Sequence, residues 1–262
     1  MAGIVPVYGI KTNLNLFFSN AVLPIGNNFY SIQRSIVECS YAGCDTIWIV
    51  CSDTDASLIK SICGDFVLSM NDYEHSKYSK FPKSNRRTIP LIYVPISYKH
   101  TNKEGLGVSV IDGISACFHA SSKISKWIVP SKYYISSPYG VYDPKINKIR
   151  THIMNSDSLF LEYNGQTAID GEHIGFCLGV EQVKHMSYLF KRMDVKSHFS
   201  LDKILNNDIV LKDMSTVDVT HYSNISEWES YCKMFSNPIK IHPQYKYCFS
   251  AGFKKQERKL ND

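Results

Sequence analysis

Short apolar runs alternate with helical spacings of apolar residues along the first half of the chain. The runs typical of buried strands lie at 4–7, 46–50, 65–69 and 89–96. Apolar residues three and four positions apart predict helices between them, over 32–41, 56–62 and 108–119. Strands that alternate with helices in this way indicate a parallel sheet covered by helices on both faces.

The second half of the chain has more turn signals and predicts hairpins. Strands are expected at 127–129, 139–142, 149–154, 173–180 and 209–211, and helices over 180–192 and 226–235. The fold class that follows is α/β, with a doubly wound, mostly parallel, Rossmann-like sheet and an added antiparallel portion. We expect a single domain over 1–245 and a basic C-terminal tail over 246–262.

The opening segment is the most informative part of the chain. The first predicted strand runs into a glycine loop over 8–14, and a Leu-Pro-Ile-Gly-Asn segment at 23–27 precedes the first helix. Gly43 is a plausible stop for that helix. Ligands of open α/β sheets bind at the carboxyl ends of the strands, so the loop after the first strand is a candidate nucleotide site.

This order of motifs resembles the sugar-phosphate nucleotidyltransferases, the family of glucose-1-phosphate uridylyl- and thymidylyltransferases. The matching segments are the Leu-Pro-Ile-Gly-Asn at 23–27, Tyr-Ala-Gly at 41–43, Glu-Gly-Leu-Gly at 104–107, Tyr-Gly-Val at 139–141 and Gly-Phe-Cys-Leu at 175–178. They span residues 4–231 in the family's order. The resemblance implies a nucleotide-diphospho-sugar transferase type of fold. It also implies an ancestral transfer of a nucleotidyl group from a nucleoside triphosphate to a sugar 1-phosphate, with Mg²⁺ if the protein is active.

The resemblance also assigns expected roles to individual residues. The expected nucleotide-binding residues are Tyr8, Gly9, Ile10, Lys11, Thr12, Asn13, Gly105, Leu106 and Gly107. The expected sugar-binding residues are Tyr139, Gly140 and Glu172. Lys11 and Lys132 are the candidate catalytic cations. We expect one cleft lined by 8–13, 105–107 and 130–132.

Several charged positions of the family have no counterpart in this chain. Nucleotidyl transfer needs cations around the triphosphate and carboxylates that hold a metal. The family's metal-binding Gly-Asp falls on 130–132, which puts Lys132 where a carboxylate is expected. The Pro-Lys pair falls on 19–20, the Glu-Lys-Pro on 154–156 and the Trp-x-Asp on 221–223. We therefore predict a degenerate active site, and the alternative function is an inactive nucleotide-binding, interaction or scaffold protein.

A second enzymatic interpretation comes from Asp53-Thr54-Asp55, because a D-x-D motif holds the metal and the nucleotide sugar in many glycosyltransferases. Here the motif directly follows the second strand, whereas in those enzymes it follows a later one. Asp53 or Thr54 is also a good N-cap for the helix over 56–62, where negative charge meets the positive end of the helix dipole. Capping is the favoured interpretation.

The eight cysteines contain no C-x-x-C pair, and the nine histidines contain no H-E-x-x-H. Zinc sites need close pairs of ligands, so the pattern favours buried free thiols in a reducing compartment and no disulfides. No apolar run approaches the roughly 20 residues of a membrane-spanning helix. We expect a cytoplasmic protein without a membrane segment. The abundance of Asn, Ile, Lys, Ser and Tyr suggests an AT-rich, viral genome.

The net charge of +5 is modest, but the cations cluster over 77–103 and 254–259. Aromatic residues are interleaved with the first cluster, as in single-stranded nucleic-acid binders. Ordinary solvated surface is the favoured interpretation. The alternative is an acidic partner, either a nucleic acid or another protein.

Overall fold

The structure is a computed structural model. It describes residues 1–9, 14, 16, 18–78, 86–100, 105–192, 205, 214–236, 239 and 241–251. Its centre is an eight-stranded sheet in the order β11-β9-β10-β7-β1-β4-β6-β5. The strands are β1 (Ala2–Pro6), β4 (Thr46–Cys51), β5 (Phe66–Leu68), β6 (Thr88–Pro95), β7 (Lys132–Ile135), β9 (Ser158–Glu162), β10 (Phe176–Gly179) and β11 (Met214–Asp218).

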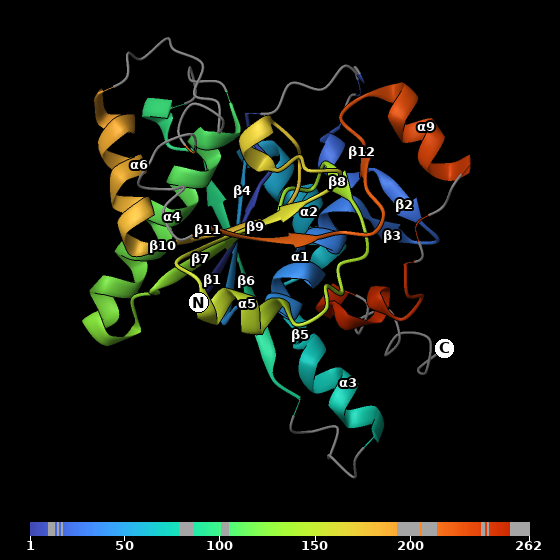
Figure 1. Cartoon of the computed structure of the whole chain (residues 1–262), viewed down its shortest axis with the longest axis horizontal. Coiled ribbons are helices and arrows are strands. Elements are labelled where there is room, and N and C mark those ends of the chain that lie inside the picture. Colours follow the sequence, from blue (N-terminus) through green and yellow to red (C-terminus); the bar gives the residue numbers. More distant parts are fainter. Residues whose placement is uncertain are drawn as a thin grey trace.

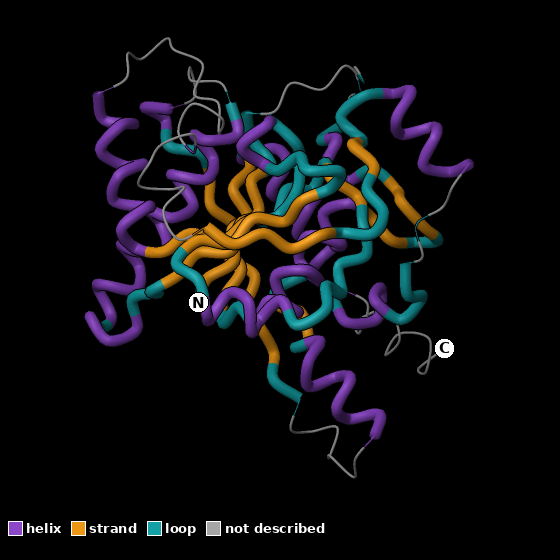
Figure 2. The backbone as a smooth tube through the Cα atoms, in the orientation of Figure 1, coloured by secondary structure: helices purple, strands orange, loops and turns teal. Residues whose placement is uncertain are grey.

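The middle of this sheet is parallel and its flanks are mixed. β1 pairs in parallel with both β4 and β7, and β4 pairs in parallel with β6. β10 runs antiparallel to β7 and β9, and β5 runs antiparallel to β6. The strands fan out with the usual twist through the centre of the molecule (Figure 2). This arrangement confirms the predicted α/β class with an added antiparallel portion.

Helices cover both faces of the sheet (Figure 1). One face is packed by α1 (Ser31–Ala42), α2 (Asp53–Cys63), α5 (Ile149–Asn155) and α9 (Trp228–Ser236). The other is packed by α4 (Leu106–Ile124) and α6 (Val180–Arg192). All twelve residues of α1 are buried. The body therefore has three layers, with an apolar core on each side of the sheet.

Shorter elements complete the fold. Two small sheets are formed by β2 (Pro24–Gly26) with β3 (Phe29–Tyr30) and by β8 (Gly140–Val141) with β12 (Ser223–Asn224). The helix α3 (Met70–Tyr78) projects from the body (Figure 1). The 3-10 helices are η1 (Asn20–Val22), η3 (Tyr98–His100), η4 (Lys126–Ile128), η5 (Ala168–Asp170) and η6 (Tyr245–Cys248).

Two predicted strands are wrong. Residues 127–129 overlap η4 instead, where the Ser125 hydroxyl accepts from the Trp127 amide and the apolar side chains face solvent. Residues 149–154 lie in helix α5, because Ile149 and Ile153 are four residues apart and both are buried, which is a helical and not a strand period. The predicted strand at 209–211 lies outside the described residues.

The packed part of the chain extends past the expected boundary at 245. Phe249 is buried and forms a bridge with Val67, and the Ser250 hydroxyl accepts from the Asp65 amide at 2.7 Å. Phe249 and Ser250 therefore pack against β5 and the residue before it. Seven of the eight cysteines are buried, in agreement with the prediction that most lie in the core.

Candidate functional site

Two glycine turns meet at the carboxyl end of β1. The Gly105 amide donates to the Gly9 carbonyl at 3.0 Å, and the Ser109 hydroxyl donates to the Tyr8 carbonyl at 2.5 Å. Gly9 has φ +88°, and a Cβ there would lie 2.6 Å from the Gly105 carbonyl oxygen. Only glycine allows this approach without a shift of the backbone. Tyr8 and Gly9 of the first predicted cleft segment therefore lie beside Gly105 of the second.

Helix α4 begins immediately after this contact. Leu106 and Gly107 form its first turn, so the positive end of the helix dipole lies beside the two glycine turns. Such a position favours a negatively charged group. The predicted nucleotide-binding residues Ile10, Lys11, Thr12 and Asn13 lie outside the described residues.

The expected sugar-binding residues converge at the same end of the sheet. The Tyr139 hydroxyl donates to the Val7 carbonyl at 3.2 Å, and the Tyr139 ring lies 5.5 Å from the His173 ring. A Cβ on Gly140 would lie 1.8 Å from the His173 carbonyl oxygen, so the close approach of β8 to His173 depends on glycine there. Next to His173, the Glu172 carboxylate accepts from the Tyr222 hydroxyl at 2.7 Å.

Two serines follow β7 at this end of the sheet, beside the end of β1. The Ser136 amide donates to the Ile4 carbonyl at 3.0 Å, which continues the pairing of β7 with β1. The Ser137 hydroxyl lies 3.3 Å from His173 Nδ1. Burial lowers the pKa of His173 to about 4, so this imidazole is neutral at physiological pH.

A buried ion pair stands directly behind the two serines. Arg34 Nη1 lies 2.7 Å from Glu38 Oε2, and neither side chain is exposed. Arg34 Nη2 donates to the Ser137 carbonyl at 2.7 Å, and the Ser136 hydroxyl donates to the Glu38 carboxylate. The end of β7 is therefore fastened to α1 through both serines.

Two tyrosines complete the shell of donors around Glu38. The hydroxyls of Tyr134 and Tyr142 donate to Glu38 Oε1 at 2.5 and 2.7 Å. Burial and the Glu38 carboxylate raise the pKa of both phenols well above the usual range, so both are neutral donors. Hydrogen bonds from every side are what allow a carboxylate to stay charged in the core.

The structure places Lys132 at the opposite end of β7. Lys132 begins the strand, in register with Gly179, and its ammonium donates to the carbonyls of Ile153 and Ser156 at the end of α5. The prediction that 130–132 shares a cleft with Gly9 and Gly105 is wrong, because the strand starts at Lys132 and ends at Ile135. The residues that follow the strand are Ser136 and Ser137.

The D-x-D segment forms the first turn of α2 and does not itself supply the N-cap. The N-cap is Ser52, one residue before the expected position, and its hydroxyl accepts from the Asp55 amide at 3.1 Å. The same hydroxyl donates to the Asp55 carboxylate at 2.7 Å. Asp53 and Asp55 thus lie in the first turn of the helix, where their charges stabilise its N-terminus. This arrangement supports capping over a glycosyltransferase metal motif.

The described residues do not fit the Mg²⁺ that the resemblance implies. Mg²⁺ prefers carboxylate oxygens, and β7 ends in two serine hydroxyls that are already engaged by Glu38 and His173. Among the described residues, no group of three or more His, Cys, Asp or Glu side chains is placed to hold a metal ion.

The predicted basic clusters fall mostly outside the described part of the chain. Arg87 forms an ion pair with Asp45, and the Arg86 guanidinium lies 4.9 Å from the centre of the Tyr73 ring. Lys99 is exposed. Residues 254–259 are not among the described residues. Throughout the described chain, every helix is too short or too polar to cross a bilayer.

The arrangement of the strands is that of a sugar-nucleotidyltransferase fold. No protein-family model matches the sequence, and no curated protein matches it in sequence. The fold is nonetheless similar to that of solved sugar nucleotidyltransferases over most of the chain, at low sequence identity.

Three solved structures illustrate the match. A UDP-glucose pyrophosphorylase complexed with UDP-glucose has a TM-score of 0.59 at 13% identity, covering 90% of this chain and 97% of its own. A Bacillus anthracis protein assigned as a glucose-1-phosphate thymidylyltransferase, in complex with sucrose, has a TM-score of 0.58 at 10% identity, covering 93% and 98%. The UDP-glucose pyrophosphorylase from Acinetobacter baumanii has a TM-score of 0.57 at 13% identity, covering 99% and 98%.

Sequence reasoning missed the residues that fix the end of β7. Arg34 and Glu38 lie four residues apart in α1, a spacing that normally marks an exposed ion pair on a helix. The signal that they are buried is their position among Ile32, Ile36 and Val37, which leaves the helix without a continuous polar face. Ser136 and Ser137 carried no signal, because the strand before them was predicted too early.

Proposed function

We propose that the protein binds a nucleotide or a nucleotide sugar at the carboxyl ends of β1 and β7 without efficient metal-dependent nucleotidyl transfer. The observation that carries this proposal is the pair Ser136 and Ser137 at the end of the central strand. Their hydroxyls are engaged by Glu38 and His173, and no carboxylate follows the strand. Two serines that are hydrogen-bonded to buried side chains thus stand where an active relative would have a metal-binding carboxylate.

The binding half of the proposal rests on the features that remain. The Gly9–Gly105 contact lets two backbone turns approach closely, beside the positive end of α4. A phosphate group is the natural ligand for such a turn at a helix N-terminus. Beside the buried Tyr139 and Gly140, the half-buried Glu172 offers a carboxylate for a sugar, and one of the similar structures holds UDP-glucose.

Binding is tested by calorimetric titration with UTP, dTTP and UDP-glucose. In Gly9→Ala the new Cβ would clash with the Gly105 carbonyl, so we expect affinity to fall by about tenfold or more, or about 1.4 kcal/mol. Gly165→Ala is the matched control. Gly165 also has a positive φ, of +75°, but nothing lies within 4 Å of its Cβ position. The control should bind as the unmodified protein does.

Transfer is tested by pyrophosphate release from the same triphosphates with glucose 1-phosphate and Mg²⁺. We expect turnover well below the common enzymatic range, which starts near roughly 1 per second. Turnover within that range would overturn the loss of activity and leave nucleotide binding intact. Failure of all three ligands to bind would contradict the proposal as a whole and favour an interaction or scaffold role.

A further inference from the structure

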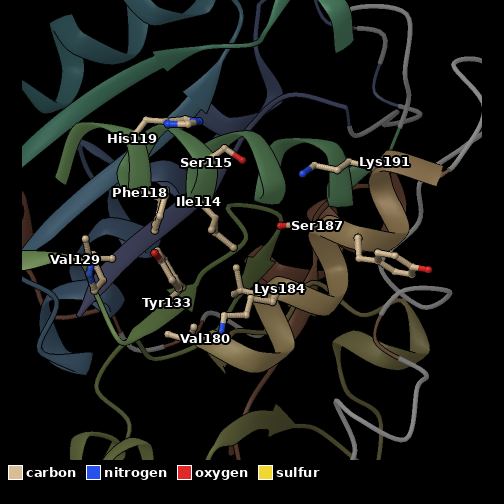
Figure 3. Close-up of a pocket in the computed structure, with 13 residues that line it drawn as sticks. Ile114, Ser115, Phe118, His119, Val129, Tyr133, Val180, Lys184, Ser187 and Lys191 are labelled. Atoms are coloured by element: carbon tan, nitrogen blue, oxygen red, sulfur yellow. The ribbon is translucent and has the colours of Figure 1, made fainter. Parts of the chain in front are cut away.

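A groove lies between α4 and α6, above the amino end of β7 and away from the glycine turns. Its volume is about 540 Å³, within the range of ligand-binding clefts. Ile114 and Phe118 of α4, Tyr133 of β7 and Val180 and Val183 of α6 form its apolar lining. Figure 3 shows Ile114, Phe118 and Tyr133 directed into the space between the two helices.

Apolar surface continues beyond the groove at the end of α4. Ile124 is 77% exposed, Trp127 is 93% exposed and Ile128 is 52% exposed, and Phe118 inside the groove is 48% exposed. Val129 and Pro130, which follow directly in sequence, line the groove. Large exposed apolar side chains gathered within a few residues of such a groove are typical of surfaces that bind another protein. Tryptophan and tyrosine are the residues most often found at the centre of such interfaces.

The charged side chains that line the groove are all basic. Lys184 and Lys191 of α6 line it, and the Arg192 guanidinium lies 4.4 Å from the centre of the Tyr188 ring at its edge. Among the described lining residues none is acidic. The nearby Glu181 pairs with Lys184, but both side chains are largely exposed, so the pair is weak. The occupant of the groove should therefore carry negative charge beside an apolar face.

We propose that this groove binds an acidic amphipathic helix of another protein. A groove between two helices accommodates the apolar face of a third, with anchors at intervals of three and four residues. Lys184 and Lys191 are seven residues apart, which is two turns or roughly 10 Å along α6. The partner helix places carboxylates about two turns apart along one edge of its apolar face, opposite these two ammonium groups.

The same charge argues against occupants from this chain. Two copies that met through this groove would bring Lys184 and Lys191 of one against the same cations of the other. The C-terminal segment contains Lys254, Lys255, Arg258 and Lys259, so it is also repelled. A partner of opposite charge is the occupant that the electrostatics favour.

The test is selection of a phage library of random 16-residue peptides on the intact protein. The selection is repeated against Lys184→Glu/Lys191→Glu, and the enriched peptides are measured by fluorescence anisotropy. We expect peptides with an apolar stripe at helical spacing and carboxylates beside it. Their affinity for the charge-reversed variant should fall by about tenfold or more, equivalent to about 1.4 kcal/mol. Peptides with lysine in place of those carboxylates should prefer the variant.

Lys60→Glu/Lys233→Glu is the control, because it reverses two exposed cations on α2 and α9, outside the groove. It should bind the acidic peptides as the unmodified protein does, and thermal unfolding should verify that both double variants fold. Enrichment of peptides without acidic residues, or of none above a protein-free control, would overturn the proposal. So would concentration-dependent dimerisation that is lost in Val183→Asp, because the groove would then bind a second copy.

Discussion

The polar residues at the two ends of β7 differ in burial and in their hydrogen-bond partners. At the amino end, the partly buried Lys132 donates to two carbonyls that terminate α5. At the carboxyl end, Ser136 and Ser137 are bound to an ion pair with no exposed surface. The first arrangement caps a helix near the surface. The second fixes the strand end on which a ligand site depends.

The difference shows that the charged side chains at the carboxyl end of β7 are buried behind the strand. A buried ion pair incurs a large desolvation cost and contributes less to net stability than its short distance suggests, but it specifies geometry when every partner is present. Most of that set is present: Arg34 Nη1 and Nη2 donate to Glu38 and the Ser137 carbonyl, and Ser136 donates to Glu38, whereas the buried Arg34 Nε has no partner in the described structure. The residues after β7 are therefore held in place by Arg34 and Glu38 of α1. The Glu38 carboxylate is buried in the core and does not face the ligand site.

The largest effect should come from breaking the buried pair. Glu38→Gln keeps the shape of the side chain but leaves the Arg34 guanidinium without an anion in a site with no exposure. We expect a loss of about 3 kcal/mol or more in the free energy of unfolding. The measurement is urea unfolding followed by tryptophan fluorescence. Arg34→Met/Glu38→Leu should cost less than the sum of Arg34→Met and Glu38→Leu, because it removes both charges.

Helix α9 offers a matched comparison for that prediction. Glu229 and Lys233 have the same four-residue spacing and the same 2.7 Å separation as Arg34 and Glu38, but their side chains are 79% and 74% exposed. Glu229→Gln should leave the unfolding curve unchanged, since water replaces the lost partner. An equal loss at the two sites would mean that burial is not what gives the Arg34–Glu38 pair its importance.

A smaller effect, confined to acid, should come from His173 beside Ser137. Its pKa is lowered by burial from 6.5 to about 4, so the unfolded chain binds this proton more readily than the folded one. The contribution of His173 is fully present above pH 6.5 and is lost as pH falls towards 4. Its share of the slope is at most about 1.4 kcal/mol per pH unit.

His173→Asn, which does not titrate, should flatten the decline of unfolding free energy between these two pH values. The exposed His221 is the control, and His221→Asn should leave the decline as it is. The measurement is the midpoint of urea unfolding at a series of pH values. An identical decline in both variants would mean that His173 is accessible to protons in the folded state.

The sequence predicted the parallel half of the sheet because strands and helices there have clear periods. The bounds of α6, residues 180–192, were predicted as observed. The strand at 127–129 was wrong because three apolar residues in a row are compatible with an exposed turn as well as a core strand, and only packing decides. Because the strand was predicted too early in the sequence, the residues after it were predicted to be 130–132, and Lys132 was assigned to the site. Lys132 in fact begins β7. The Arg34–Glu38 pair could not be predicted, because burial of a charged pair depends on partners about 100 residues away.

Lys132→Met should have a modest effect at the amino end of β7. The change removes two hydrogen bonds to the last carbonyls of α5, and we expect a loss of about 1 kcal/mol in the free energy of unfolding, since water can reach part of this site. Nucleotide affinity should stay the same, because Lys132 lies at the far end of the strand from Gly9. A drop in affinity without a drop in stability would return Lys132 to the candidate site.

The smallest effect is expected at cations remote from both ends of β7. Arg86 and Arg87 already contact Tyr73 and Asp45, and Arg87 is exposed. Arg86→Ala/Arg87→Ala should leave thermal unfolding nearly unchanged, because such surface pairs contribute little.

The same variant tests the predicted nucleic-acid partner. Binding to these cations would give a slope of log affinity against log salt near −0.7 per phosphate contact with single strands, and the variant would flatten it. Because these arginines are already engaged within the chain, we expect no binding of short single-stranded DNA or RNA in anisotropy titrations at low salt. A salt-dependent affinity that the variant weakens would contradict this expectation.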